Sequence, residues 1–171
     1  MTGKLLVAAV FCVLSGCATT EPVKVATSGK SEVAVADVPG DVLAAAVALR
    51  PTFTAAEAER ETREGRRYFD VSGTLADGSE IEFDIMEEGG GWRVVEIQRD
   101  LQLSGLPSAV REAARRHDAA FTPGRIIESD QTDGIVIYEL FGPRGGDPQG
   151  RKVEIKWDGS RAKVLTKEWA L

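Results

Sequence analysis

Residues 153–159 read VEIKWDG, a stretch that combines alternating residues with turn residues. Apolar and charged residues alternate along VEIKW, which is the period of a strand with one buried face. Asp158-Gly159 is a preferred sequence for a two-residue hairpin turn, and Arg161–Trp169 is long enough to form a closing strand. The stretch therefore predicts an antiparallel hairpin near the end of the chain.

A helix and further strands are predicted before this hairpin. Ile135–Phe141 is rich in β-branched and aromatic residues, which favour strands, and Arg125–Asp130 is a shorter candidate strand. Pro107–His117 has small apolar residues on one side and arginines on the other, which predicts an amphipathic helix. This half of the chain is therefore predicted to be one helix followed by an antiparallel meander.

The same order of residues occurs earlier in the chain. The longest matches pair Phe69-Asp70-Val71-Ser72-Gly73 with Tyr138-Glu139-Leu140-Phe141-Gly142, and Ile81-Glu82-Phe83 with Val153-Glu154-Ile155. Shorter matches pair Val38-Pro39 with Leu106-Pro107, Phe53-Thr54 with Phe121-Thr122, and Val94-Val95 with Val164-Leu165. Matches that keep one order along the chain indicate an internal repeat. The first copy predicts a helix over 39–49 and strands over 67–74, 81–85 and 92–98.

One segment gives conflicting signals. Residues 55–64 read AAEAERETRE, a composition that favours a helix. The matching segment of the second copy, GRIIESDQ, does not favour a helix. The repeat therefore predicts a strand over Ala55–Glu64, and a second helix there is the alternative.

The N-terminal sequence predicts a targeting signal. Leu5–Leu14 is apolar but too short to span a bilayer core, which needs about 20 helical residues. The sequence Leu14-Ser15-Gly16-Cys17 at the end of this run resembles the lipobox of bacterial lipoproteins. The resemblance implies a signal peptide over 1–16, lipidation of Cys17, and transfer to the outer membrane because residue 18 is not aspartate. Residues 17–36 are predicted to be the lipidated N-terminus and a flexible tether.

The repeated pattern resembles the PepSY-like and β-lactamase-inhibitor-protein-like domains. The residues that carry the resemblance are the helices opening at Val38-Pro39 and Leu106-Pro107, Tyr138-Glu139-Leu140, and Trp157-Asp158-Gly159 before the last strand. It implies an α+β fold of two tandem helix-plus-antiparallel-meander units, with the helices on one face of the sheet. The two repeats would cover 37–103 and 104–171. Small outer-membrane assembly lipoproteins are a rival resemblance, which the duplication fits less well.

Composition narrows the function classes. The net charge is −6, which does not favour nucleic-acid binding because such proteins present a basic surface. The cysteines are Cys12, inside the apolar run, and Cys17, so we expect no disulfide, reactive thiol or cysteine metal site in the mature domain. His117 is the single histidine and is interpreted as an exposed helix-end residue. We therefore predict no catalytic residues, no metal site and no cofactor.

Two side-chain groups are candidates for binding. Glu80, Glu82 and Asp84 share one face of a strand by period two, and we interpret them as a solvated outer face, with a Ca²⁺ site as the alternative. Ile135, Ile137 and Phe141 are apolar residues on the strand face expected to point away from the helices. An exposed apolar face of this kind is typical of a partner-binding surface. Covering by the tether or by the loop 143–150, or packing between the two units, is the alternative.

These observations predict a lipid-anchored protein of the cell envelope. Its expected location is the outer membrane, with the domain facing the periplasm. It would bind another envelope protein, without catalysis of its own, and would inhibit or regulate a peptidase or envelope assembly. A small-ligand or Ca²⁺-binding lipoprotein is the alternative function. The oligomeric state does not follow from the sequence.

Overall fold

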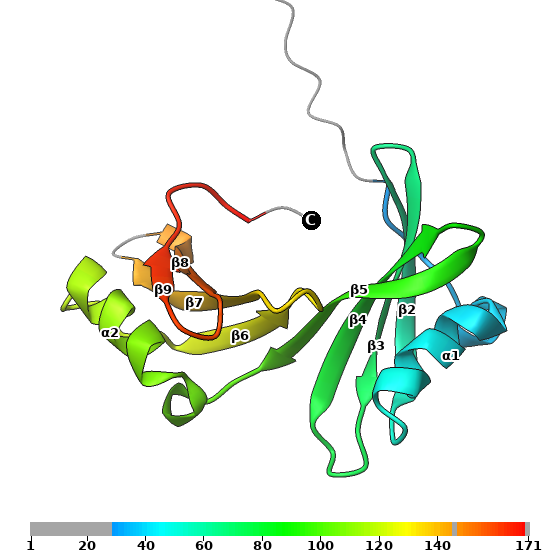
Figure 1. Cartoon of the computed structure of the whole chain (residues 1–171), viewed down its shortest axis with the longest axis horizontal. Coiled ribbons are helices and arrows are strands. Elements are labelled where there is room, and N and C mark those ends of the chain that lie inside the picture. Colours follow the sequence, from blue (N-terminus) through cyan, green and yellow to red (C-terminus); the bar gives the residue numbers. More distant parts are fainter. Residues whose placement is uncertain (1–28, 145–146, 170–171) are drawn as a thin grey trace, which may run out of the picture.

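The computed structural model of the chain describes residues 29–144 and 147–169. Nine strands form one antiparallel sheet, and each strand pairs with the next one along the chain (Figure 1). The strands are β1 (Ser31–Glu32), β2 (Thr54–Arg63), β3 (Arg66–Thr74), β4 (Glu80–Glu88), β5 (Gly91–Asp100), β6 (Arg125–Asp130), β7 (Val136–Arg144), β8 (Asp147–Trp157) and β9 (Ala162–Val164). The helices are α1 (Gly40–Leu49), α2 (Ser108–His117) and the short 3₁₀ helices η1 (Val35–Asp37) and η2 (Leu103–Gly105).

The predicted α+β fold of two tandem helix-plus-meander units is wrong. The protein is mostly antiparallel sheet, and its two α-helices in the described residues are short. Residues Ile97–Asp100 of β5 pair with Ile127–Asp130 of β6, so the strands that were expected in two units continue as one sheet. Periodicity predicts where strands occur, but it does not tell which strand edges pair with each other.

Both helices lie on the same face of this sheet. Val42 and Ala46 of α1 are fully buried in a core with Phe83 and Ile85 of β4. Val110 of α2 lies in a second core that includes Leu140 and Ile155. Because side chains alternate along a strand, every second residue of β2–β8 points away from these cores and forms the second face.

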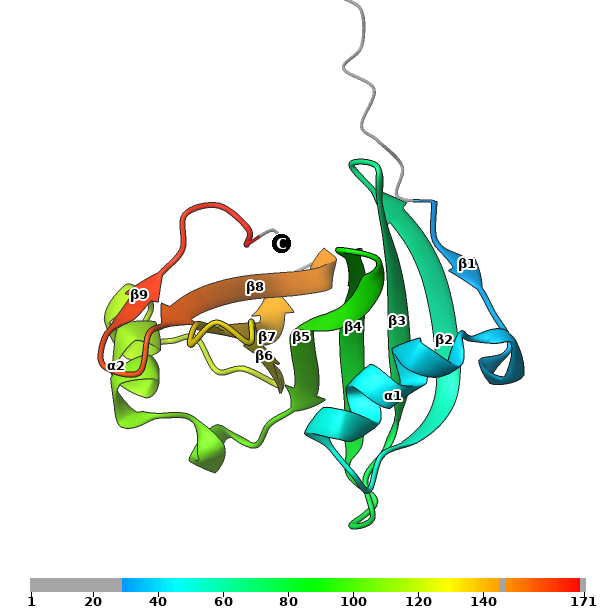
Figure 2. The same cartoon turned by 45° about the vertical axis from the view of Figure 1, so that its right-hand side comes forward.

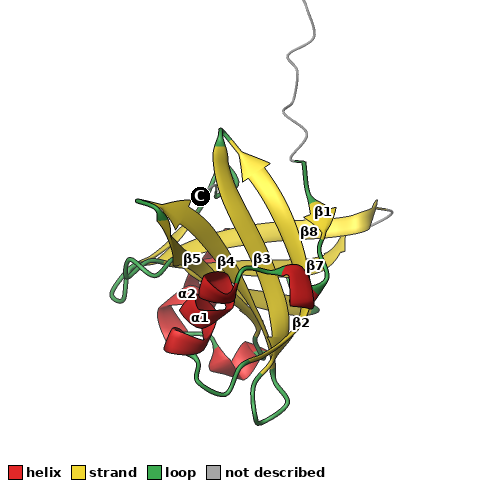
Figure 3. Ribbon diagram, turned by 90° about the vertical axis from the view of Figure 1, so that its right-hand side faces the viewer, coloured by secondary structure: helices red, strands yellow, loops and turns green. Residues whose placement is uncertain are grey.

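The sheet is strongly curved. It bends at β5, so that β2–β4 and β6–β9 form two walls of a wide V, with one helix against each wall (Figures 1 and 2). A view from the side shows the long strands β2–β5 twisting past β7 and β8 (Figure 3). The segment after β9 returns toward the space between the two walls (Figure 1).

Two strand glycines are required by close packing. A Cβ atom on Gly73 would lie against the carbonyl oxygen of Thr54 and 2.9 Å from the ring of Phe53. A Cβ atom on Gly142 would likewise meet the ring of Phe121. Phe53 therefore packs directly on the backbone of Gly73, and Phe121 packs on that of Gly142. This packing explains why a Phe and a Gly both occur in each copy of the internal repeat.

Several local predictions can be compared with the strands observed. The strand predicted over Ala55–Glu64 is confirmed as β2, because pairing with β3 along its whole length outweighs the helix propensity of its residues. The closing strand predicted over Arg161–Trp169 is wrong in extent, since only Ala162–Val164 pairs with β8. The turn before it spans four residues, 158–161, rather than two, because Trp157 pairs with Ala162.

The end of the expected tether belongs to the fold. Ser31 and Glu32 pair with Arg60 and Glu59 of β2, and η1 follows directly. The prediction of a flexible segment up to residue 36 is therefore wrong for its last residues, because their backbone forms an edge strand of the sheet.

Candidate functional site

The second face of β2–β5 carries two rows of polar side chains that cross the strands. Direct cross-strand pairing places Glu57, Ser72, Glu82 and Gln98 in one row. The neighbouring row consists of Glu59, Asp70, Asp84 and Glu96. Neighbouring strands are only about 4.8 Å apart, so these carboxylates lie close together on the face that the helices leave uncovered.

The closest group of acids consists of Asp70, Glu82 and Asp84. One carboxylate oxygen of each lies within 4.8 Å of the others. Asp70 is 4% exposed and Asp84 is 7% exposed, whereas Glu82 is half-buried. Like charges this close and this poorly hydrated repel each other, so they need nearby cations or protons.

Two basic side chains supply part of the positive charge that these acids need. Arg63 Nη2 lies 2.9 Å from Asp84 Oδ2 and 3.5 Å from Asp70 Oδ1, while its Nε lies 2.8 Å from Glu61 Oε2. Lys30 Nζ lies 2.6 Å from Asp70 Oδ2 and 3.2 Å from Glu59 Oε2. Asp70 is therefore paired with both cations, and the Lys30 ammonium is the nearer of the two.

The carboxylate group has unusual acid–base properties. Burial and, next, the charge of Asp70 raise the pKa of Asp84 to about 8, although Arg63 acts in the opposite direction. Burial is also the main cause of the raised pKa of Glu82, and the charge of Asp70 adds to it. A pKa near 8 favours the protonated form of Asp84 at neutral pH.

Asp84 is expected to make folding pH-dependent. The unfolded chain releases this proton near pH 4, whereas the folded protein keeps it up to about pH 8, so the free energy of unfolding falls as pH rises between these values. Asn resembles the protonated carboxyl group. Asp84→Asn should therefore gain roughly 4 kcal/mol relative to wild type between pH 5 and pH 8, measured by urea denaturation. Equal pH slopes for both proteins would contradict this, and exposed Glu112→Gln is the control.

A second polar network connects the bend of the sheet to the C-terminal segment. Ser129 Oγ and Gln131 Nε2 both donate to Glu96 Oε1, the latter at 2.9 Å. Trp169 Nε1 donates to Gln131 Oε1 at 2.8 Å, and the Trp169 backbone N–H donates to Glu154 Oε2 at 2.7 Å. The segment after β9 is thus held over the second face of β6–β8.

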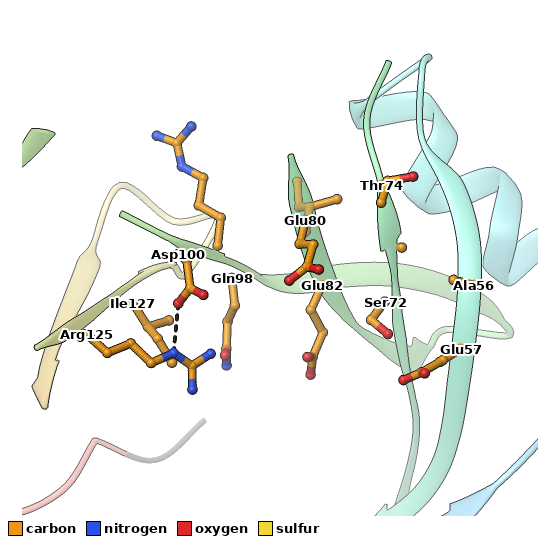
Figure 4. Close-up of a pocket in the computed structure, with 13 residues that line it drawn as sticks. Ala56, Glu57, Ser72, Thr74, Glu80, Glu82, Gln98, Asp100, Arg125 and Ile127 are labelled. Atoms are coloured by element: carbon orange, nitrogen blue, oxygen red, sulfur yellow. Dashed lines mark hydrogen bonds and ion pairs between the residues drawn. The ribbon is translucent and has the colours of Figure 1, made fainter. Parts of the chain in front are cut away.

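The second face of β2–β5 remains open and is hollowed. One hollow of about 280 Å³ lies over β2–β6, and Figure 4 shows Glu57, Ser72, Glu82 and Gln98 projecting to the same side of the strands. A second hollow of about 490 Å³ lies between β2–β4 and the segment Glu32–Val35. The two hollows share Ala56, Glu57, Ser72 and Glu82. We call this continuous depression the acidic groove.

The apolar residues predicted as a partner surface do not form one. Ile137 is only 1% exposed, and Ile135 and Phe141 are half-buried. Ile137 pairs with Ser129 and Lys156, both on the face over which the C-terminal segment passes. Lys156 Nζ lies 4.7 Å from the centre of the Trp169 ring, so the C-terminal segment lies over this face.

Other predicted sites have different outcomes. Cys17, the predicted lipidation site, lies outside the described residues, and its lipidation remains a prediction. Glu80 is exposed as expected, but Asp84 is buried, so the row Glu80, Glu82 and Asp84 is not simply a solvated face. His117 is exposed at the end of α2, on the helix side of the sheet.

Sequence reasoning missed Asp70, Arg63 and Lys30. One signal for Asp70 was present, because a hairpin centred on Asp77 places Asp70 directly opposite Asp84. Arg63 reaches the group from the next strand, and Lys30 comes from the expected tether, so no spacing pattern indicated either contact.

Known proteins give no further guide to this site. No protein-family model, curated protein or solved structure matches the chain. None of the helices within the described ranges is long and apolar enough to cross a membrane. The acidic groove therefore has to be interpreted from the residues that form it.

Proposed function

We propose that the protein is a lipid-anchored module of the cell envelope that binds another protein and has no catalytic activity of its own. The lipobox-like sequence ending at Cys17 supports the anchor. The observation that carries the binding role is the acidic groove, a hollowed sheet face that α1 and α2 leave uncovered. Such a module would act by occupying a peptidase or an assembly component of the envelope.

The contacts of the acids favour binding over catalysis. Asp84 and Asp70 are tied to Arg63 and Lys30, an arrangement that holds charge in place rather than presenting a nucleophile beside a base. His117 lies on α2, on the opposite side of the sheet from the groove. The groove therefore offers fixed charges and a broad surface, which suit recognition of a macromolecule.

Binding of Ca²⁺ or another small ligand is the second candidate function, and Asp70, Glu82 and Asp84 are the observation that favours it. Ca²⁺ takes about six to eight oxygen ligands, and carboxylates are its common protein ligands. However, the Lys30 ammonium already lies 2.6 Å from Asp70. A calcium ion would have to displace this ammonium, whereas a protein segment could lie in the open groove beside it.

Photo-crosslinking in cells that produce the protein tests the binding role. A photoreactive amino acid at Glu57, which is exposed and lines the groove, should give a crosslink to one envelope protein. The same amino acid at Glu112, on the outer side of α2, should give none. Equal crosslinking from both positions, or no crosslink from position 57, would contradict the proposal.

A further inference from the structure

We infer that the acidic groove takes an extended segment of the partner that carries lysine or arginine side chains. This inference rests on the proposed binding function and adds the chemistry of the partner. The charges that line the groove and the position of Lys30 beside Asp70 support it.

The groove has a large excess of negative charge. Five carboxylates line the hollow beside the N-terminal segment, namely Glu32, Glu57, Glu59, Asp70 and Glu82. The other hollow adds Glu80 and Asp100, together with Arg99 and Arg125. Arg125 Nε lies 2.9 Å from Asp100 Oδ1, so these two charges offset each other, and Arg99 Nη2 is paired with Glu128 Oε1 at 2.6 Å. A basic segment complements this surface.

Asp70 shows that this face can hold a cation. It is 4% exposed and lines the hollow, and its Oδ2 atom lies 2.6 Å from the Lys30 ammonium. Buried carboxylates are normally hydrogen-bonded, because losing water without a replacement donor is costly.

Lys30 indicates which donor fits. Its ammonium lies between Asp70 and Glu59 at the end of the groove, while its side chain remains 43% exposed. The face therefore already accommodates one alkylammonium, supplied by the chain itself. Glu57 and Glu82, the next carboxylates along the groove, have no ion pair among the described residues and are available to further cations.

The length of the groove sets the size of the segment. From β2 to β6 there are four gaps between strands of about 4.8 Å, so the groove crosses ~19 Å of sheet. An extended chain advances about 3.3 Å per residue, so about six residues span it, and alternate side chains face the sheet.

Isothermal titration calorimetry of the full chain in detergent tests this inference. The probe is an acetylated and amidated Lys-Ser-Lys-Ser-Lys-Ser peptide at low salt and pH 7.5. We expect Glu57→Gln combined with Glu82→Gln to weaken binding about tenfold. Asp41→Asn combined with Glu112→Gln removes the same charge from the helices and should change affinity less than about twofold. Equal losses in both variants, or equal binding of a peptide with glutamine in place of lysine, would overturn the inference.

A second variant is expected to strengthen binding, a result that a misfolded groove could not produce. Lys30→Met removes the built-in ammonium and should strengthen peptide binding about threefold, because Asp70 and Glu59 become available. Lys163→Met, at an exposed position of β9, should leave the affinity unchanged. Weaker binding in Lys30→Met, with the fold intact by circular dichroism, would overturn the inference.

The result is separable from that of the photo-crosslinking experiment. Failure of peptide binding together with a partner crosslinked at position 57 would reject the basic segment and keep the binding function. Peptide binding without any crosslinked partner would reject the binding function in the cell and keep the chemistry of the groove.

Discussion

Gly73→Ala is expected to lower the free energy of unfolding by about 3 kcal/mol or more. The added Cβ atom would meet the backbone carbonyl of Thr54 and would lie 2.9 Å from Ala55 Cα. Backbone atoms of a paired strand cannot move aside as a flexible side chain can. The cost would therefore be paid by displacing β2 from β3 beside the irregular pairing between Ala55 and Glu57.

Urea denaturation measures this effect, and two other glycines calibrate it. Gly91→Ala should cost little, because its Cβ atom would lie 4.0 Å from the nearest atom, Glu88 O. Gly142→Ala should fall between the two, because its main obstacle is the ring of Phe121, which can partly shift. Equal stability of Gly73→Ala and Gly91→Ala would show that Thr54 and Phe53 do not pack against Gly73 as described.

Arg63→Met is expected to destabilise the protein by about 3–5 kcal/mol at pH 7. Its guanidinium contacts Glu61, Asp70 and Asp84, all of which are less than one-tenth exposed. Methionine keeps part of the apolar side chain but leaves these acids facing each other without their main counter-charge. The loss should be larger at pH 9 than at pH 7, because above about pH 8 Asp84 gives up the proton that relieves part of the repulsion among these acids.

The control for this variant is Arg60→Met. Arg60 is an exposed arginine of the same strand that faces the other side of the sheet, so its replacement should change stability by less than about 0.5 kcal/mol. Urea denaturation at pH 7 and pH 9 compares the two variants. A loss for Arg63→Met that is the same at both pH values would mean that packing, not charge, explains the effect.

The strands were largely predictable because alternation of apolar and polar residues and strand propensity are properties of the local sequence. Arg125–Asp130 was predicted and observed as β6 with the same bounds. The alternation in VEIKW and the turn residues after it likewise located the end of β8. The overall architecture was not predictable in the same way. Joining β5 to β6 depends on two strand edges meeting in space, and alternation within a strand carries no information about that meeting.

The site was predictable only in part, for a related reason. Period two correctly placed Glu82 and Asp84 on one face, and a register count from the turn could have added Asp70. The burial of Asp84 could not be inferred, since it depends on Arg63 and on the curvature of the sheet. The patch of Ile135, Ile137 and Phe141 failed because the C-terminal segment, predicted as a strand, lies over that face instead.

The two ends of the sheet are formed by very short strands. β1 has two residues and β9 has three, and their neighbours β2 and β8 have ten and eleven. A long, regular outer strand invites another copy to add to it, and short outer strands discourage such stacking. The anchor proposed at Cys17 would concentrate copies of the protein on a membrane surface, where they would meet often. These blunted borders would let many copies share that surface without growing into fibrils.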